Sequence, residues 1–337
     1  MAETAQRRAI RDRLLARLTR LERRLRLWRG VRHVQGPARF DLGPDDVVVV
    51  ALVRDGMFYL DEFLRHHRAI GARHFVFFDN GSQDATLARL KDEPGCAVLQ
   101  STLPWGDYEN DFRAIAARRY SMGHWCLFVD MDEMFDPPGN LPLPDLARRL
   151  RQGDHSALVA QMLEMFADAP LRDMATLPYD QVLQRFDHCD LGHVTTRDYH
   201  DPAIGFSWWL NHNTAPPEVK ILFGGLRNRV FGEDCCLTKH PLVHLSPGVM
   251  PAVHPHCSAH VRCSDVTGVI RHYKFANHPA ARDARSVESG AIPHGEDRLR
   301  LSRMQGDPAL SLMGPTAQRY TGEGMLRDAG FLVGRAP

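Results

Sequence analysis

Short apolar runs alternate with helical segments between residues 47 and 133, and this alternation limits the possible folds more than any other feature. The first run, Val47–Val53, is rich in β-branched residues and bounded by turn residues, as in a strand buried on both faces. Further runs predict strands at His74–Phe78, Ala97–Leu99 and Trp125–Val129. Helical periodicity predicts intervening helices over residues 58–69, 84–90 and 111–120. The order predicts an α/β fold with a doubly wound sheet, which is parallel over these residues and becomes mixed when the second half of the chain is added.

Polar clusters follow the second and fourth of these predicted strands. Residues 79–84 read Asp-Asn-Gly-Ser-Gln-Asp, and residues 130–133 read Asp-Met-Asp-Glu. Ligands of open parallel sheets bind beyond the carboxyl ends of the strands. Both clusters are therefore expected in one binding site.

The acidic cluster at 130–133 suits a hard divalent cation. Asp130 and Asp132 can share such an ion and leave its remaining positions for water and phosphate oxygens. A bound cation of this kind neutralises the charge of a diphosphate leaving group. An acidic turn before Pro137-Pro138-Gly139 is the simpler alternative, but the apolar strand in front of the cluster favours a site.

The cluster at 79–84 combines a turn with a possible ligand contact. Asn80-Gly81 predicts a turn, and either Ser82 or Asp84 can cap the following helix. Asp79 ends a buried strand, so capping explains it less well. Its carboxylate is placed to accept hydrogen bonds from a base or a ribose hydroxyl.

Composition excludes several other classes. The chain has 337 residues, of which 44% are hydrophobic and 25% charged, and its net charge of +1 does not favour a nucleic-acid partner. No apolar run approaches the roughly 20 residues of a membrane span. The seven cysteines form no CxxC pair, so a zinc knuckle or disulfide framework is not expected. These features predict a cytoplasmic protein with reduced thiols.

The N-terminal segment is strongly basic. Residues 1–32 hold eleven arginines against Glu3, Asp12 and Glu22. A narrow apolar seam with spacings of four and three residues runs along the expected helix, formed by Leu14, Leu18, Leu21, Leu25 and Trp28. Three interpretations stay open: a docking or short coiled-coil helix, a helix lying on the inner face of an anionic membrane, and a solvated helix.

Three regions follow from these patterns. Residues 1–36 are expected to form the basic amphipathic helix, and residues 37–285 the α/β domain, whose irregular second half completes the sheet. Residues 286–337 are polar and punctuated, which predicts a peripheral segment.

The order of several segments resembles glycosyltransferase family 2, and most closely its branch related to family 92. Residues 51–55, 60–67 and 71–74 resemble the opening of that family. Residues 78–86 resemble its nucleotide-binding turn, and residues 125–135 resemble its metal-binding strand end. Shorter later blocks lie at residues 225–231, 239–243 and 270–275. One departure is Arg54-Asp55-Gly56, where the family often has Lys-Asn-Glu.

The resemblance implies a GT-A fold and transfer of a sugar to an acceptor hydroxyl. The implied donor is a nucleoside-diphosphate sugar, with UDP-sugars favoured, and the implied cofactor is Mn²⁺ or Mg²⁺. The acceptor would be a glycan or a lipid-linked molecule in the synthesis of cell-surface glycans or polysaccharides. Direct displacement would invert the anomeric carbon, with a carboxylate as the general base.

The family pattern assigns roles to particular residues. Those expected at the nucleotide-sugar are Arg54, Asp55, Asp79, Asn80, Ser82, Asp84, Asp130 and Lys239. Candidate metal ligands are Asp130 and Asp132, with Asp132 preferred; apart from the family pattern, the histidine-rich stretch at 254–272 adds His272 and His256. Glu233-Asp234 resembles the acidic pair that supplies the base, and a surface loop is the alternative interpretation. Two rival functions use the same carboxylates: a metal-dependent nucleotidyltransferase, and a nucleotide-sugar or glycan-binding module without turnover.

Overall fold

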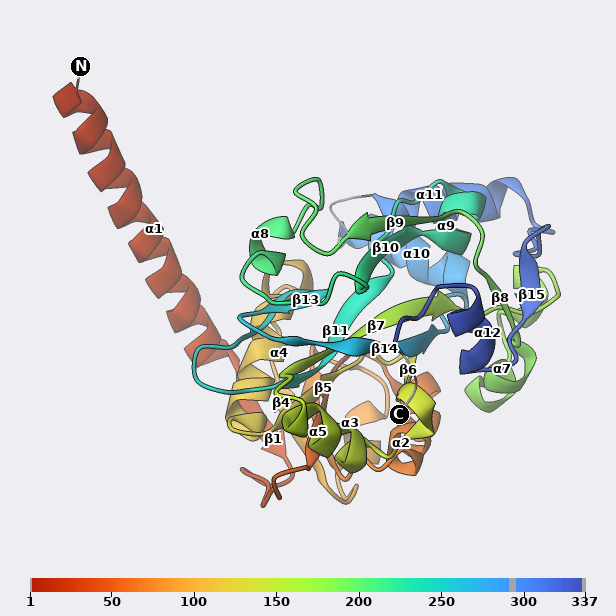
Figure 1. Cartoon of the computed structure of the whole chain (residues 1–337), viewed down its shortest axis with the longest axis horizontal. Coiled ribbons are helices and arrows are strands. Elements are labelled where there is room, and N and C mark those ends of the chain that lie inside the picture. The colour runs from red at the N-terminus through yellow and green to blue at the C-terminus, as the bar shows by residue number, and fades with distance from the viewer. Residues whose placement is uncertain (1, 291–294, 335–337) are drawn as a thin grey trace.

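A nine-stranded mixed sheet forms the centre of the molecule in the computed structural model (Figure 1). The structure describes residues 2–290 and 295–334; within the first helix, side chains are described for residue 15 and from residue 17 onward. Its strand order is β1-β4-β3-β2-β5-β11-β7-β14-β6. These strands are β1 (Arg32–Gln35), β2 (Val47–Val53), β3 (His74–Asp79), β4 (Cys96–Gln100), β5 (Trp125–Phe128), β6 (Glu133–Asp136), β7 (Ala157–Glu164), β11 (Thr238–His244) and β14 (Cys263–His272).

The first half of the chain builds the parallel part of this sheet. β2 pairs in parallel with β3 and β5, and β3 pairs in parallel with β4. The crossover helices are α2 (Met57–Ala69), α3 (Thr86–Leu90) and α4 (Trp105–Ser121). All four predicted strands are confirmed. Helix α4 begins six residues before the predicted start, directly after Pro104, whose fixed φ suits entry into a helix.

The second half extends the sheet with both orientations. β11 is antiparallel to β5 and β7, β14 is parallel to β7, and β6 is antiparallel to β14. The expectation of a mixed α/β sheet is confirmed, and so is the expectation that the irregular half completes it. Three two-stranded sheets flank it, built from β8 (His188–Asp190) with β15 (Ala317–Arg319), β9 (Val194–Asp198) with β10 (Lys220–Gly224), and β12 (Met250–His254) with β13 (Cys257–Ala259).

Both faces of the sheet are buried. Successive residues of β2 belong to opposite clusters: Val49 packs in one with residues of α2 and α5, whereas Val50 packs in the other with residues of α4. This explains why β2 is apolar throughout rather than alternating. The remaining helices are α5 (Leu143–Gln152), α6 (Leu171–Met174), α7 (Tyr179–Arg185), α8 (Ser207–Leu210), α9 (Gly225–Phe231), α10 (Pro279–Ser289), α11 (Glu296–Gly306) and α12 (Glu323–Asp328), with a 3₁₀ turn at Pro138–Asn140.

The C-terminal segment differs from the peripheral character that the sequence predicts. Leu326, Phe331 and Leu332 belong to the larger core cluster. Arg300 on α11 is 2% exposed. The polar sequence of this segment hides its packing, because composition does not reveal that Arg300 is buried in ion pairs with Glu233 and Asp283.

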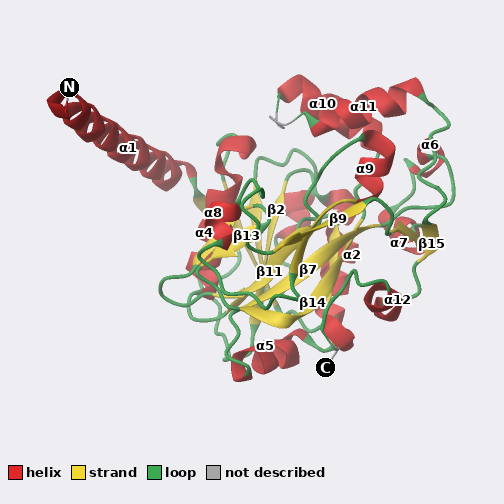
Figure 2. Cartoon of the chain, turned by 45° about the horizontal axis from the view of Figure 1, so that its top comes forward, coloured by secondary structure: helices red, strands yellow, loops and turns green. Residues whose placement is uncertain are grey.

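Helix α1 (Ala2–Gly30) projects from the body of the molecule (Figures 1 and 2). Its last turns contact α4, where Leu27 is buried and the guanidinium of Arg23 binds the Asp111 carboxylate. Among the described residues, no helix is long and apolar enough to cross a membrane. All seven cysteines are buried and free, as the sequence predicts.

Candidate active site

Two turns at the carboxyl ends of β2 and β3 are locked together. Asp55 accepts hydrogen bonds from the backbone N–H of Gln83 (2.7 Å), and its own N–H donates to Ser82 Oγ (2.9 Å). Asp84 accepts from the N–H of Met57 at 3.1 Å, so one carboxylate joins the start of α2 to the second turn. Three predicted nucleotide residues, Asp55, Ser82 and Asp84, are thus brought together as a rigid platform. Asp84 also accepts from the N–H of Thr86, the first residue of α3, but the N-cap position is Ala85, so neither Ser82 nor Asp84 is the N-cap of this helix.

Asp79 is fully buried beneath this platform. Its carboxylate accepts from the N–H of Gly81 (3.0 Å), the N–H of Ser82 (3.1 Å) and Gln100 Nε2 (2.9 Å). The sequence argument assigns Asp79 to the nucleotide, whereas the structure shows it organising the turn. Asn80, likewise predicted at the nucleotide, donates to two backbone carbonyls of the 101–103 loop.

Gly56 explains the departure from the family pattern. Its N–H donates to Thr86 Oγ1 at 2.8 Å, and a Cβ added here would lie 2.4 Å from Val53 Cγ2. A glutamate in its place would therefore require the buried Val53 side chain to shift. The neighbouring Arg54 has an exposed side chain.

Asp130 is held between two cations. Its Oδ1 lies 2.8 Å from Arg113 Nη2, and its Oδ2 lies 2.9 Å from Lys239 Nζ. Lys239 also binds Glu133, whose other oxygen accepts the N–H of Asp130 at 2.9 Å. Burial raises the pKa of Asp130, but Lys239 and Arg113 outweigh it and hold the pKa well below its usual range. Asp130 is thus a permanent anion whose two oxygens are already engaged.

The strand register brings Lys239 to Asp130. β11 pairs antiparallel with β5, with Leu242 opposite Leu127, so the same register continued by three residues places Lys239 opposite Asp130. Arg113, which no sequence pattern singles out, comes from helix α4. It lies on the buried face of α4 with Phe112, Ala116 and Ala117, and apolar periodicity hides such a charge.

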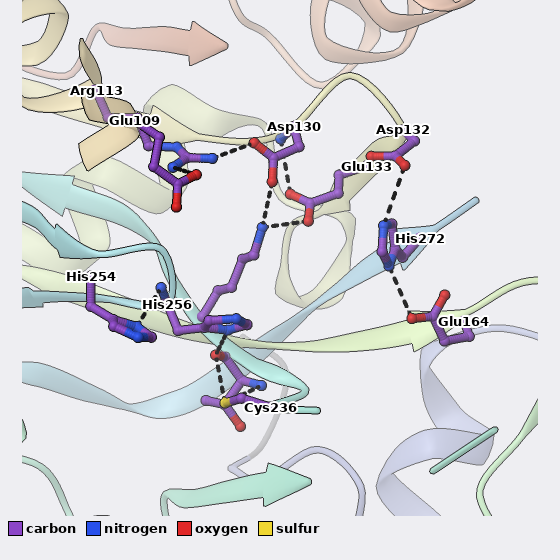
Figure 3. A network of polar contacts seen from close by, with 12 residues as sticks. Glu109, Arg113, Asp130, Asp132, Glu133, Glu164, Cys236, His254, His256 and His272 are labelled. Atoms are coloured by element: carbon purple, nitrogen blue, oxygen red, sulfur yellow. Dashed lines mark hydrogen bonds and ion pairs between the residues drawn. The ribbon is translucent and has the colours of Figure 1, made fainter. Parts of the chain in front are cut away.

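Asp132 faces a different partner. Its Oδ2 lies 3.5 Å from His272 Nε2, and its carbonyl accepts the N–H of Tyr273 at 2.8 Å. The opposite ring nitrogen of His272, Nδ1, lies 3.1 Å from Glu164 Oε1 (Figure 3). β14 lies between β7 and β6, with His272 opposite Glu164 on one side and Glu133 on the other. Three adjacent strand ends therefore fix this acid–imidazole–acid row.

Charge, not burial, decides the protonation of this row. Burial alone would lower the pKa of His272, but Glu164 and Asp132 raise it to about 9. Burial raises the pKa of Glu164, but His272 and Arg227 outweigh burial and lower the pKa to about 2. The imidazole is therefore a cation between two carboxylates when no other ion is bound.

The row continues into the interior as a buried chain of charges. Glu164 Oε1 lies 2.9 Å from Arg227 Nε, and Arg227 Nη1 lies 3.4 Å from Glu233 Oε2. Glu233 in turn binds Arg300, which holds Asp283 at 2.8 Å. Glu233, a predicted catalytic base, is 2% exposed and its carboxylate contacts two guanidinium groups. Its neighbour Asp234 is exposed.

Tyrosine and cationic side chains surround Asp132. Burial is the main cause that raises the pKa values of Tyr59 and Tyr179, and the negative charge of Asp132 raises both as well. Lys274 is also close, and burial followed by Arg300 lowers its pKa. The Tyr179 hydroxyl is buried without a hydrogen-bond partner. This concentration of donors makes the space beside Asp132 attractive to an anion.

The other candidate metal ligand, His256, is oriented elsewhere. Its Nδ1 contacts the carbonyl of Thr238 at 2.9 Å, and its N–H donates to His254 Nδ1 at 3.2 Å. Figure 3 shows His256 beside His254, apart from Asp132 and His272. Burial and then Lys239 lower its pKa well below the ordinary range. Asp132 and His272 are thus the predicted ligands that the structure pairs.

The pair can be tested for its fit to Mn²⁺ or Mg²⁺. Two ligands about 2.1 Å from one ion, at angles of about 90–110°, lie about 3.0–3.4 Å apart. The Asp132–His272 separation of 3.5 Å is close to that span. A carboxylate on the second ring nitrogen, here Glu164, is the usual support of a metal-bound histidine. Within the described residues no three His, Cys, Asp or Glu side chains are grouped to hold a metal ion, so phosphate and water would complete the shell.

Comparison with known proteins gives partial matches. The chain is 29% identical over 103 residues to a glycosyltransferase family 92 protein of Oryza sativa subsp. japonica. It is 27% identical over 109 residues to a family 92 protein of Ricinus communis. These similarities support a glycosyltransferase relationship.

The extent of the matches sets the scope of that relationship. They cover 30% and 31% of this chain, and 18% and 20% of the two relatives, so the chain spans about a fifth of their length. Family 92 is separate from family 2, and the family 2 assignment has no support from them. No protein-family model matches the chain.

Proposed function

We propose that this chain is a glycosyltransferase that moves a sugar from a nucleoside-diphosphate sugar, preferably a UDP-sugar, to an acceptor hydroxyl. The Asp132–His272–Glu164 row carries the proposal, because it pairs a hard oxygen ligand with an oriented imidazole at the strand ends. The similarity to glycosyltransferase family 92 proteins supports the same reaction class.

The divalent cation would be held by Asp132 and His272. When bound, it neutralises negative charge on the diphosphate leaving group. Asp130 has a different task in this proposal: its carboxylate fixes Lys239 and Arg113 beside the acidic cluster. Lys274, close to Asp132, adds positive charge for the phosphates.

The platform at the ends of β2 and β3 would hold the nucleoside. Asp55 and Asp84 are exposed there, and each still presents carboxylate to solvent beside its turn contacts. Asp79 would act indirectly, by shaping the turn that presents Ser82. Arg54 is exposed at the same strand end, where it would meet phosphate charge.

The acceptor hydroxyl requires a base for direct displacement with inversion. Glu233 is a poor base because Arg227 and Arg300 occupy its carboxylate. We retain Asp234, the exposed member of the pair, as the proposed base. The acceptor would be a glycan or a lipid-linked molecule.

A donor panel tests the proposal. The purified chain is incubated with nucleoside-diphosphate sugars, with and without Mn²⁺, and released nucleoside diphosphate is measured. Release that requires Mn²⁺ supports the transferase. Donor binding without release, with any acceptor offered, would identify a binding module instead. Pyrophosphate release from a nucleoside triphosphate and a sugar phosphate would identify a nucleotidyltransferase.

A further inference from the structure

Helix α1 presents an apolar stripe to solvent. Leu18, Leu21, Leu25 and Trp28 are 61%, 55%, 43% and 79% exposed, although large apolar side chains are normally covered. All four lie on the projecting helix of Figure 1. Together with Leu14 they make up the five-residue seam of the sequence, and in this subsection the seam means these four exposed residues.

The contacts of α1 with the body orient this seam outward. Leu27 is 8% exposed, and Arg23 binds Asp111 and lies over the ring of Tyr108, 4.3 Å from its centroid. At about 100° per residue, Leu27 lies roughly 180° from Leu18 around the helix. The seam is therefore on the side of α1 away from the body. It stays accessible while the helix is docked.

Arginines border the seam on both sides. Arg17 and Arg24 are exposed along one edge, and Arg26 along the other, where it pairs with Glu22 at 2.6 Å. Residues 1–32 hold eleven arginines against three acidic residues, whereas the whole chain has a net charge of +1. The positive charge is thus concentrated on the same element as the exposed apolar side chains.

We propose that α1 binds an anionic lipid surface through the seam and its bordering arginines. An apolar stripe flanked by arginine, with a tryptophan near one end, suits a helix lying at the boundary between headgroups and acyl chains. Each arginine near an anionic surface adds electrostatic attraction. This proposal is independent of the proposed catalytic function.

A second copy of the chain fits the seam less well. The seam spans fewer heptads than the three or four that mark a sustained coiled coil. In a parallel pair, Arg24 of one copy would face Arg29 of the other, and Arg17 would face Glu22, because these residues occupy the flanking positions. The repulsive and the attractive contact offset each other, so the flanking charges give a second copy no net support, whereas the excess of arginine favours an anionic surface.

Vesicle sedimentation tests the proposal. The full chain is mixed with vesicles of phosphatidylcholine alone, and with vesicles that also contain phosphatidylglycerol. We expect binding to the anionic vesicles, weakened by salt. Leu21→Ser with Leu25→Ser should lower the partition coefficient roughly tenfold or more, since both leucines would insert. Leu299→Ser, at a leucine on α11 that is 48% exposed, is the matched control and should bind like the parent.

Other outcomes overturn the proposal. Equal binding to neutral and anionic vesicles would remove the role of charge, and unchanged binding of the double variant would remove the role of the seam. Sedimentation velocity on the same proteins tests whether a second copy of the chain covers the seam instead. A dimer that dissociates in the double variant, together with no vesicle binding by the parent, would assign the seam to a second copy. Both leucines are exposed, so the fold of the variant is expected to be intact and is checked by its melting temperature.

Discussion

His272 Nε2 lies 3.5 Å from Asp132 Oδ2, while the other nitrogen of the same ring lies 3.1 Å from Glu164. The residues come from three different strand ends, yet the register of β6, β14 and β7 makes them neighbours. The arrangement gives His272 a fixed orientation toward Asp132. It also separates the acidic cluster into two parts, because Asp130 is turned toward Arg113 and Lys239 instead.

Glu164→Gln should weaken the binding of Mn²⁺ by Asp132 and His272 without removing either proposed ligand. The amide cannot stabilise the oriented imidazole as a carboxylate does, and loss of such support typically costs about 10- to 100-fold in metal affinity. Calorimetric titration of Mn²⁺ in the presence of UDP measures this. Glu22→Gln, in an exposed ion pair with Arg26, is the control and should change nothing. Equal Mn²⁺ affinity in Glu164→Gln and the parent would argue against the pair.

Lys239→Met should destabilise the fold. The substitution leaves the carboxylates of Asp130 and Glu133 without the buried ammonium between them, and removing one partner of a buried ion pair costs about 3–5 kcal/mol. Urea unfolding measures the loss. Lys220→Met, which breaks an ion pair with the 80% exposed side chain of Asp198, should cost less than about 1 kcal/mol. Similar losses in the two variants would contradict the buried role of Lys239.

Arg300→Met tests the interior end of the charge chain. Arg300 is 2% exposed and binds both Glu233 and Asp283, so its loss takes away the cation beside Asp283 and leaves Glu233 with Arg227 alone. It should also cost about 3–5 kcal/mol. Arg303→Met lies one turn along α11 in an exposed pair with Asp307 and provides the comparison. A melting temperature equal to that of Arg303→Met would show that the chain of charges does not stabilise the fold.

Acidification should destabilise the protein before its carboxylates titrate. Burial lowers the pKa of His240 to about 4, and burial followed by His66 lowers that of His67 well below its ordinary range. An unfolded histidine takes up a proton near pH 6.5, so the unfolded state binds protons first as the pH falls. The stability that neutral His240 and His67 contribute is complete above about pH 6.5 and declines toward pH 4, by roughly 1–3 kcal/mol per group. His272, whose pKa is raised to about 9, gives the opposite slope, and it does so above pH 6.5.

Urea unfolding at several pH values between 7.5 and 4.5 measures this slope. His240→Phe removes one of the groups and should flatten the slope, even if the variant is less stable at pH 7.5. A free energy of unfolding that stays constant over this range in the parent protein would contradict the buried, neutral state of these imidazoles.

The parallel half of the fold follows from the sequence because its strands are buried on both faces. Apolar runs such as Val47–Val53 can be recognised without knowing their neighbours. For the same reason the sequence predicts that the acidic cluster follows a strand, and it does follow β5. Glu164 carries the same signal, an acid after the apolar stretch from Ala157, but its strand lies in the irregular half, where no periodic pattern marks it.

The pairing of distant charges could not be predicted. Which cation meets Asp130 depends on the register of β11, and which acid supports His272 depends on the register of β7. Neither register leaves a local pattern in the sequence. Glu233 is an example. The acidic pair that it forms with Asp234 suggests a catalytic base, whereas its carboxylate is buried in an ion pair with Arg300.

The central claim is that Asp132, with His272, holds a divalent cation that binds the diphosphate of a sugar donor. Calorimetric titration of UDP-sugar into the parent and Asp132→Ala, each with and without Mn²⁺, measures it directly. Asp61→Ala, at an exposed carboxylate of α2, controls for loss of surface charge. We predict that Mn²⁺ strengthens donor binding to the parent and to Asp61→Ala but not to Asp132→Ala. Mn²⁺-dependent affinity that is the same in Asp132→Ala and the parent would contradict the claim.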